Sequence, residues 1–253
     1  MRSRACVALT PALLLIGSVA AAAGISLPPG SRLDLNGGAA ALAAQDLRID
    51  GALTLGSGSV LDLASLRLGA GGQADLGSGV VELGGDWENR GSLAAGSSRV
   101  RFVDGPADSA LLGSTTFASA SFVSATGKRY RFESGSTQSV AAQLDILGTG
   151  APVQIDVTQP GSVAFLDLLP SGTQSIANVG VSDVHAIGQA LAPNQTNQGG
   201  RGNDTGWFGN GGGPIGQAVS VPSSSPGGLA LFALTLLGAA LLAFRRFASA
   251  GAS

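Results

Sequence analysis

The stretch that decides the fold is Gly58-Ser59-Val60-Leu61-Asp62-Leu63, in which apolar and polar side chains alternate. Such alternation is typical of a strand with one buried face and one solvated face. The pattern returns as Ser78-Gly79-Val80-Val81-Glu82-Leu83 and again as Ser97-Ser98-Arg99-Val100-Arg101-Phe102. The spacing is 20 and then 19 residues (63 to 83 to 102), which indicates a repeat.

A second series of triplets has nearly the same period. It reads Leu33-Asp34-Leu35, Leu53-Thr54-Leu55, Ala74-Asp75-Leu76 and Ser92-Leu93-Ala94, at spacings of 20, 21 and 18 residues (33 to 53 to 74 to 92). Two independent series with one period predict stacked units, each of which buries its apolar face only against the next.

Helical repeats need long runs without helix breakers, but glycine interrupts this region every few residues, and the fixed Asn of leucine-rich repeats is absent. We therefore predict an all-β fold, a right-handed parallel β-helix with rungs of ~20 residues. An antiparallel β-sandwich is the alternative, although hairpin dipeptides are few: Asn36-Gly37, Asp50-Gly51 and Asp104-Gly105. The β-helix requires these side chains to point inward: Leu53, Leu55, Leu61, Leu63, Val81, Leu83, Val100 and Phe102. Asp62, Glu82 and Arg101 should point outward.

Composition supports a narrow core. The chain has 253 residues, of which 40 are Gly and only 5% are aromatic. Leu, Val and Ala must therefore fill most of the interior, with Trp87 and Trp207 as the largest core candidates and Trp207 closing the end of the coil. The formal net charge of -2 leaves no basic field for phosphates, which argues against nucleic acid as a partner.

The N-terminal residues 1–23 have the layout of a secretory signal peptide, with basic Arg2 and Arg4, an apolar run and a small-residue ending. Ala21 and Ala23 suit the -3 and -1 positions of a signal peptidase site, which predicts Gly24 as the mature N-terminus. The single cysteine, Cys6, lies in this segment, so the mature chain would have no disulfide.

The C-terminal part divides into three predicted segments. Residues 209–226 are rich in Gly, Pro and Ser and read as a linker between the ectodomain (residues 24–208) and the membrane. Residues 227–247 form a predicted transmembrane helix, with no charge before Arg245 and Arg246. These arginines would lie on the cytoplasmic side, followed by a short tail, residues 248–253.

This tail resembles the C-terminal sorting signals of Gram-negative bacteria, of the IPTL type and the related PEP type. Val221, Pro222 and Ser225 match the IPTL motif, with Ser223 in place of Thr and Ser224 in place of Leu. The segments 85–91 and 202–208 look like motifs of bacterial exported β-helix and adhesin-like proteins. The resemblance implies export across the inner membrane and a membrane-anchored, cell-surface or extracellular-matrix location. The implied partners are the membrane, a sorting protease or transpeptidase, and a glycan or surface-protein ligand.

The residues favour a structural, adhesin-like protein over an enzyme. His185 is the only histidine, with Asp183 two residues away but no nucleophile elbow, so we expect a structural role. A zinc site cannot be built from one histidine and no mature cysteine. No catalytic, cofactor-binding or metal-binding residue is assigned, and no cofactor is expected.

Two alternatives remain open, a carbohydrate-active β-helix lyase or hydrolase and a self-assembling matrix component. The enzyme would need two converging carboxylates, or a carboxylate with a basic residue, on the outside of the coil. The predicted outward acids Asp34, Asp62, Asp75 and Glu82 could line a sugar or calcium site, but solubility is the favoured role. The basic run from Lys128 to Arg131 is expected to be a solvated strand face.

Overall fold

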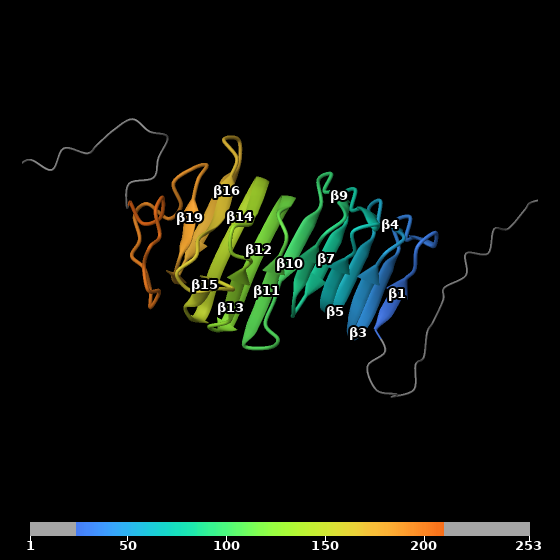
Figure 1. Ribbon diagram of the computed structural model, residues 1–253, viewed down its shortest axis with the longest axis horizontal. Coiled ribbons are helices and arrows are strands. Elements are labelled where there is room, and N and C mark those ends of the chain that lie inside the picture. The colour runs from blue at the N-terminus through green and yellow to red at the C-terminus, as the bar shows by residue number, and fades with distance from the viewer. Residues whose placement is uncertain (1–23, 210–253) are drawn as a thin grey trace, which may run out of the picture. The chain divides into compact units, whose positions relative to one another are not determined.

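The computed structural model describes residues 24–209, and this part of the chain is built of strands and turns (Figure 1). The nineteen strands, in chain order, are β1 (Ile25–Leu27), β2 (Arg32–Asp34), β3 (Ala39–Ile49), β4 (Ala52–Thr54), β5 (Ser59–Leu68), β6 (Gln73–Asp75), β7 (Val80–Leu83), β8 (Trp87–Asn89), β9 (Ser92–Ala94), β10 (Arg99–Phe102), β11 (Asp108–Leu112), β12 (Thr115–Thr126), β13 (Arg129–Phe132), β14 (Thr137–Ala151), β15 (Val153–Val157), β16 (Ala164–Leu168), β17 (Thr173–Ala177), β18 (Val179–Val181) and β19 (Val184–Ala186).

All strand pairings within residues 24–209 are parallel, and each strand pairs with strands about one turn of the chain before and after it. The fold is therefore a parallel β-helix of about eight turns, as predicted, and the antiparallel sandwich is wrong. Stacked rungs let each strand bond above and below at ~4.8 Å, which is how short strands become stable.

The coil has three faces. The first face is a stack of strands in this order: the first part of β3, the first part of β5, β7, β10, the second part of β12, the second part of β14, and β17. The second stacks β1, the ends of β3 and β5, β8, β11, β13, β15 and β18. The third is a separate four-stranded sheet of β2, β4, β6 and β9 in the first turns, and β12, β14, β16 and β19 in the later ones.

One corner of the early turns explains the recurring glycines. Gly56, Gly77 and Gly96 follow successive strands of the four-stranded sheet and all have left-handed backbones, with φ of 62°, 52° and 57°. They also stack, since a Cβ on Gly77 would lie 2.2 Å from the carbonyl oxygen of Gly56. Only glycine tolerates both the dihedral angle and the contact, so the sequence repeats it once per turn.

The predicted inward residues are buried with one exception. Leu53, Leu55, Leu63, Val81, Leu83, Val100 and Phe102 are at most 2% exposed. Leu61 is only half-buried, and Val60 takes its place in the core. The cause is a bulge: Val60 pairs with Val81 but Leu63 pairs with Leu83, so β5 holds one residue more, and Asp62 has a left-handed φ of 55°. The alternation was extended through this bulge, which is why the Leu61 prediction is wrong.

The predicted outward residues lie on the surface. Asp62 and Arg101 are exposed, and Glu82 is partly exposed and pairs with Arg101 across the rungs, 2.7 Å between Oε2 and Nη1.

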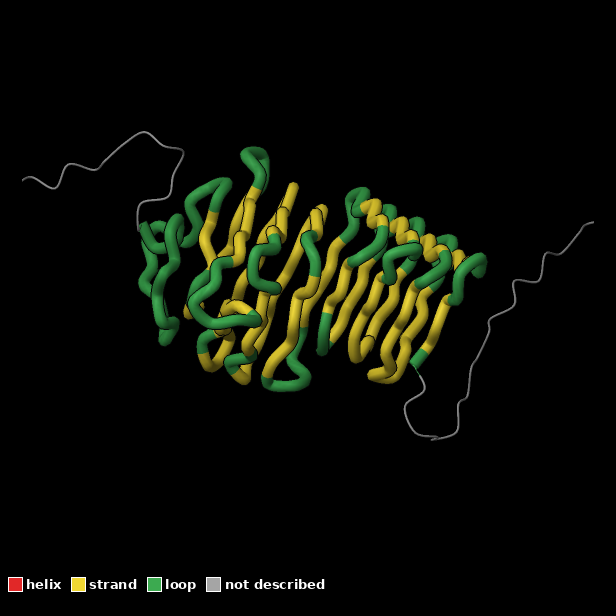
Figure 2. The backbone as a smooth tube through the Cα atoms, in the orientation of Figure 1, coloured by secondary structure: helices red, strands yellow, loops and turns green. Residues whose placement is uncertain are grey.

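The last turn of the coil is covered by residues 187–209, which form loops and isolated bridges (Figure 2). Trp207 is completely buried, bridges Leu191 and packs against Phe208 at 5.8 Å between ring centroids. Leu191 and the half-buried Phe208 join the same hydrophobic cluster as the coil interior. The structure thus confirms Trp207 as the residue that closes this end.

The predicted signal peptide and the predicted helix of residues 227–247 lie outside the described residues, as do Val221, Pro222, Ser225, Arg245 and Arg246. Within residues 24–209 there is no helix that is long and apolar enough to cross a membrane.

Candidate functional site

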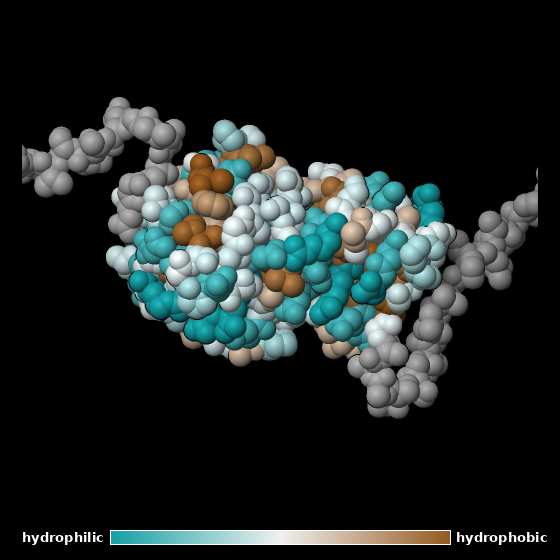
Figure 3. All heavy atoms as spheres, viewed as in Figure 1, coloured by the Kyte–Doolittle hydropathy of each residue, from teal (hydrophilic) through white to brown (hydrophobic). Residues whose placement is uncertain are grey.

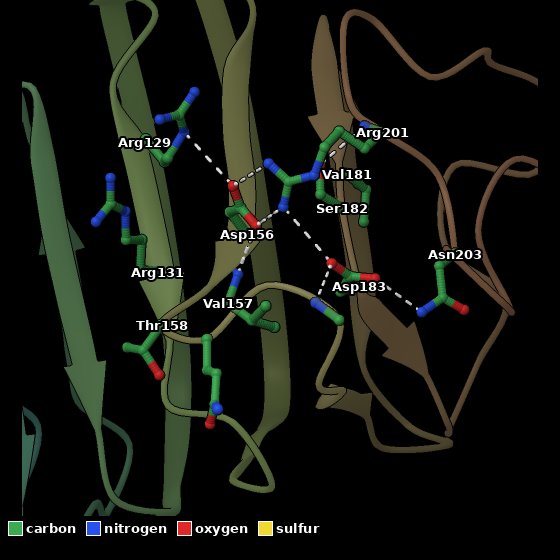
Figure 4. Close-up of polar contacts among 12 residues, drawn as sticks. Arg129, Arg131, Asp156, Val157, Thr158, Val181, Ser182, Asp183, Arg201 and Asn203 are labelled. Carbon is green, nitrogen blue, oxygen red and sulfur yellow. Dashed lines mark hydrogen bonds and ion pairs between the residues drawn. The ribbon is translucent and has the colours of Figure 1, made fainter.

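Charged side chains from several turns come together on the outside of the later rungs (Figure 4). We call this group the ion-pair ladder, and it consists of Asp108, Arg129, Arg131, Asp156, Asp183 and Arg201. Asp108 begins β11, the two following arginines lie in β13, and Asp156 lies in β15. Asp183 follows β18, and Arg201 comes from the loops that cover the end. Parallel stacking brings these residues together although the chain separates them by up to 93 positions (108 to 201).

Asp156 is the centre of the ladder. Its carboxylate accepts two hydrogen bonds from Arg201, at 2.8 Å and 3.3 Å, and lies 3.7 Å from Nε of Arg129. The backbone N–H of Val157 donates a further bond to it at 2.8 Å. Its side chain is only 9% exposed, so solvent screens these contacts less than at an open surface.

Asp183 is the second carboxylate on Arg201, at 3.5 Å. It also accepts hydrogen bonds from Asn203 Nδ2 at 2.8 Å and from the backbone of Gly161 at 3.3 Å. The Asn203 bond, followed by the backbone bond and Arg201, holds the pKa of Asp183 below its usual range despite partial burial. The bond to Asp156 raises the pKa of Arg201. Asp183 therefore stays ionised and Arg201 protonated at neutral pH, which suits ion pairing rather than proton transfer.

The ladder continues to His185 through Asn203. His185 Nε2 lies 3.1 Å from Asn203 Oδ1, so Asn203 stands between the histidine and Asp183. The imidazole also packs edge-on against Phe165, with 6.2 Å between ring centroids. These contacts orient His185 as part of a hydrogen-bonded surface.

The predicted row of outward acids is not a continuous stripe. Asp34 and Asp75 occupy the same position two rungs apart, separated by Thr54. Each accepts a bond from a turn backbone, from the N–H of Asn36 at 3.1 Å and of Gly77 at 3.0 Å. Among residues 24–209, no three His, Cys, Asp or Glu side chains gather in a group that could hold a metal ion. These acids stabilise turns.

The basic run is not a solvated face throughout. Lys128 is 2% exposed and Tyr130 fully buried, whereas Arg129 and Arg131 are half-buried and belong to the ladder. Lys128 Nζ donates to the carbonyl oxygens of Gly84 and of Val103, the latter at 3.0 Å, and lies 5.2 Å from the Tyr130 ring centroid. Burial lowers the pKa of Lys128 to about 8.

Two shallow hollows lie away from the ladder. One, of about 610 Å³, is at the corner of the first turns, lined by residues including Arg32, Arg48, Asp50 and Gln73. The other, of about 300 Å³, lies beside the covering loops around Gln174 and Gln195. The ladder residues line neither hollow, and within the ladder three arginines balance three aspartates.

Sequence reasoning found Asp183 and His185 but missed the ladder. Asp156 and Arg201 stand 45 positions apart, and only the lengths of the intervening turns bring them into contact. Comparison of the chain with family models, with curated proteins and with solved structures finds no match.

Proposed function

We propose that this chain is an exported bacterial surface or envelope protein of adhesin type, which binds through the outside of its β-helix and catalyses no reaction. The observation that carries the proposal is the arrangement of the ladder. Its carboxylates and guanidiniums neutralise one another, so that each charged group of the ladder is held in an ion pair. The parallel β-helix supports it, since such coils offer long surfaces on which neighbouring rungs repeat a contact.

The proposed ligand is a neutral glycan. Three arginines balanced by three aspartates give the ladder no net charge, so it has no preference for polyanions. The more accessible groups of the ladder, the guanidinium of Arg201 and the carboxylate of Asp108, can donate to and accept from hydroxyl groups. Contacts of this kind are individually weak, about 4 kcal/mol for a millimolar site, and gain strength when several sites act together.

Export and anchoring belong to the same proposal. Cleavage after Ala23 would release Gly24 as the first residue, and residues 227–247 would hold the tail in the membrane with Arg245 and Arg246 inside. A sorting protease or transpeptidase would act near Val221 and Pro222. Mass spectrometry of the protein recovered from cells tests both ends, and a mature chain that still begins at Met1 contradicts export.

Binding is tested on the full chain purified from cells in mild detergent. A glycan array is compared for the wild type, for Arg201→Ala and for the matched control Arg48→Ala, which breaks an exposed ion pair in the early turns. We expect Arg201→Ala to weaken binding to the neutral glycans about tenfold or more and Arg48→Ala to leave it unchanged. Equal binding by all three proteins contradicts a role for the ladder.

One observation keeps the carbohydrate-active enzyme as a second candidate. Asp156 and Asp183 converge on one guanidinium on the outside of the coil, the arrangement that the enzyme would need. The same preparations are therefore incubated with polysaccharides and assayed for new reducing ends and for unsaturated products. If the wild type releases either product, and Asp156→Asn or Asp183→Asn abolishes that release, the chain is an enzyme and the adhesin proposal is overturned.

A further inference from the structure

The two ends of the β-helix differ. At the last turns, residues 187–209 bond to the exposed strand edges. The backbone of Gln198 and Gly202 donates to Val179 and Val181, and the side chains of Gln174 and Gln195 bond to Ala190 and Ile176. This end is closed by the chain itself.

At the first turn, the strands have a neighbour on one side only. β1 pairs with β3, β2 with β4, and the first part of β3 with β5, and within residues 24–209 nothing stacks on their other edges. A row of free N–H and C=O groups is a template for pairing with another chain.

The apolar side chains of this turn are correspondingly uncovered. Ile25, Leu27 and Leu33 occupy the same inward positions as Leu47, Ile49 and Leu53 of the next turn. The later residues are at most 1% exposed, whereas Ile25 is 36% exposed and the other two are half-buried. Leu35 and Leu42 are half-buried as well. The coil therefore ends in an aliphatic surface, here called the open end.

The open end has only partial protection of its strand edges, from Pro28 and Pro29 after β1 and from Arg32 and Asp34 on β2. β1 carries no charge, and neither does the stretch Ala39-Ala40-Ala41-Leu42-Ala43-Ala44 at the start of β3. Natural sheets place charges, prolines or covering segments at free edges. A bulge at Ala43 and Ala44, both with positive φ, interrupts this edge at one corner only. Predicted cleavage after Ala23 would leave just Gly24 before β1, too little chain to cover the end.

We propose that the open end is the interface of a dimer, in which it meets the open end of a second copy of this chain. The partner is a copy because the surface is self-complementary about a two-fold axis through β2. Such an axis places β2 antiparallel to β2 of the other copy. It also places β1 of each copy beside the first part of β3 of the other, so that strand edges meet on all three faces.

The charges on β2 fit the same axis. Arg32 and Asp34 are exposed on either side of the inward Leu33, and within one copy they pair with each other at 3.4 Å, so the dimer would exchange this pair for two pairs between copies. If the axis passes at Leu33, Arg32 of one copy faces Asp34 of the other, twice over. The rise of the coil also makes the two surfaces complementary in shape. Within the first turn, β1 lies nearest the end of the coil and the start of β3 lies furthest from it, so the protruding β1 of one copy meets the recessed β3 of the other. The covered last turn prevents head-to-tail stacking, so the assembly closes at two copies and does not grow into a filament.

The test is a charge swap on the exported full chain, with mass measured by light scattering in detergent. We expect the wild type to be a dimer at micromolar concentration. Arg32→Asp places like charges opposite each other and should weaken the dimer about tenfold or more. The double variant with Arg32→Asp and Asp34→Arg restores opposite charges and should restore the dimer. Both side chains are exposed in one copy, so unchanged thermal melting of the monomer checks that the fold is intact.

Cross-linking in cells gives a second readout. In a Cys6→Ser background, Asp34→Cys should give a covalent dimer with a short bismaleimide. Ala94→Cys is the matched control, since it occupies the same outward position of the same sheet three rungs away and should give none.

Three results would overturn the proposal. The first is a monomeric wild type, including one that keeps residues before Gly24 as its own cover. The second is a dimer that Arg32→Asp leaves unchanged, and the third is equal cross-linking at both cysteines. None of these bears on glycan binding, so this proposal and the adhesin proposal fail separately.

Discussion

The early turns, residues 24–102, and the later turns, residues 103–209, build one coil in two ways. Paired residues in the early turns are 18 to 22 positions apart, from Gln45 and Leu63 to Ile25 and Leu47. In the later turns the spacing reaches 30, from Gln143 to Thr173. Of the ten buried polar or charged residues, only Ser98 lies in the early turns. The core of the regular rungs is thus almost entirely apolar, whereas the irregular rungs also contain buried polar side chains.

The buried polar side chains satisfy backbone groups that irregular rungs leave without a strand partner. Lys128 bonds to the carbonyl oxygens of Gly84 and Val103, and Gln138 to that of Gly113 at 2.7 Å. The half-buried Asn178 likewise bonds to the carbonyl oxygens of Gly148 and of the exposed Gly150, at 3.1 Å and 3.0 Å. An unsatisfied buried carbonyl is costly, so departures from the repeat require such donors.

Aromatic rings mark the change from one kind of rung to the other. Trp87 contacts Phe102 and Phe117, at 6.2 Å and 5.3 Å between ring centroids, and Phe102 stacks on Phe122 at 4.6 Å with planes 2° apart. The indole N–H of Trp87 donates to Thr115 across the change at 3.1 Å. On the outside, polar and apolar residues are intermingled over both regions (Figure 3). The regions therefore differ in their cores.

The largest expected effect comes from charging the aliphatic core. Leu83 is fully buried within the hydrophobic cluster of the coil, so Leu83→Asp should destabilise the fold by more than about 4 kcal/mol. Urea unfolding followed by circular dichroism measures the loss. Glu82→Gln changes the adjacent outward residue and should cost less than about 1 kcal/mol. Similar stabilities for the two variants would contradict the assignment of the inward face.

A smaller effect, specific to the later turns, is expected from pH. The pKa of Lys128 falls from 10.5 in the unfolded chain to about 8 in the fold. Between these values the unfolded chain binds more protons, so stability should rise with pH, by about 2 kcal/mol from pH 8 to pH 10. Burial raises the pKa of Tyr130, so the unfolded chain loses that proton first and stability should fall again above pH 10.

Lys128→Met is the control for this prediction, since it keeps the length of the side chain without a titrating group. Urea unfolding at pH 8, 9 and 10 should show the rise in the wild type only. An equal rise in the variant would mean that another group is responsible.

The smallest effect separates shielded from open ion pairs. Arg201→Gln removes the bidentate partner of Asp156, which is 9% exposed, and should cost about 1 kcal/mol. Arg48→Gln breaks a pair whose arginine is 59% exposed and should change stability less than Arg201→Gln does, because solvent screens the open pair. Thermal melting at low and at high salt compares them, and a larger loss for Arg48→Gln would reverse the ranking.

The comparison also explains what could be predicted from the sequence. Where the period is regular, alternation and spacing locate the inward residues, and the stacking of Leu33, Leu53 and Ala74 follows from the triplets. The fourth triplet was aligned one residue out of register, because Ala74 pairs with Leu93 and not with Ser92. The bulge at Asp62 defeats the same rule because one inserted residue reverses the faces beyond it. Lys128 could have been recognised as inward, since it precedes Tyr130 and Phe132 at spacings of two. Its charge argued for the surface, and the carbonyls that bind it lie 25 and 44 positions earlier.

The ladder could not have been predicted, because its geometry depends on how many residues each irregular turn inserts. Asp183 was noted only as a neighbour of His185. Its actual partners are Arg201 and Asn203, both from the loops that cover the last turn.

The stacking of the rungs has a mechanical consequence. The hydrogen bonds between strands run along the axis of the coil, and the described chain enters at the first turn and leaves at the last. A pull on the two ends therefore loads these bonds one rung at a time rather than all at once. Each rung that opens frees about 20 residues, or about 70 Å of extended chain at ~3.4 Å per residue. An anchored protein of this design would lengthen in steps under load, and the early turns, without buried polar contacts, would yield first.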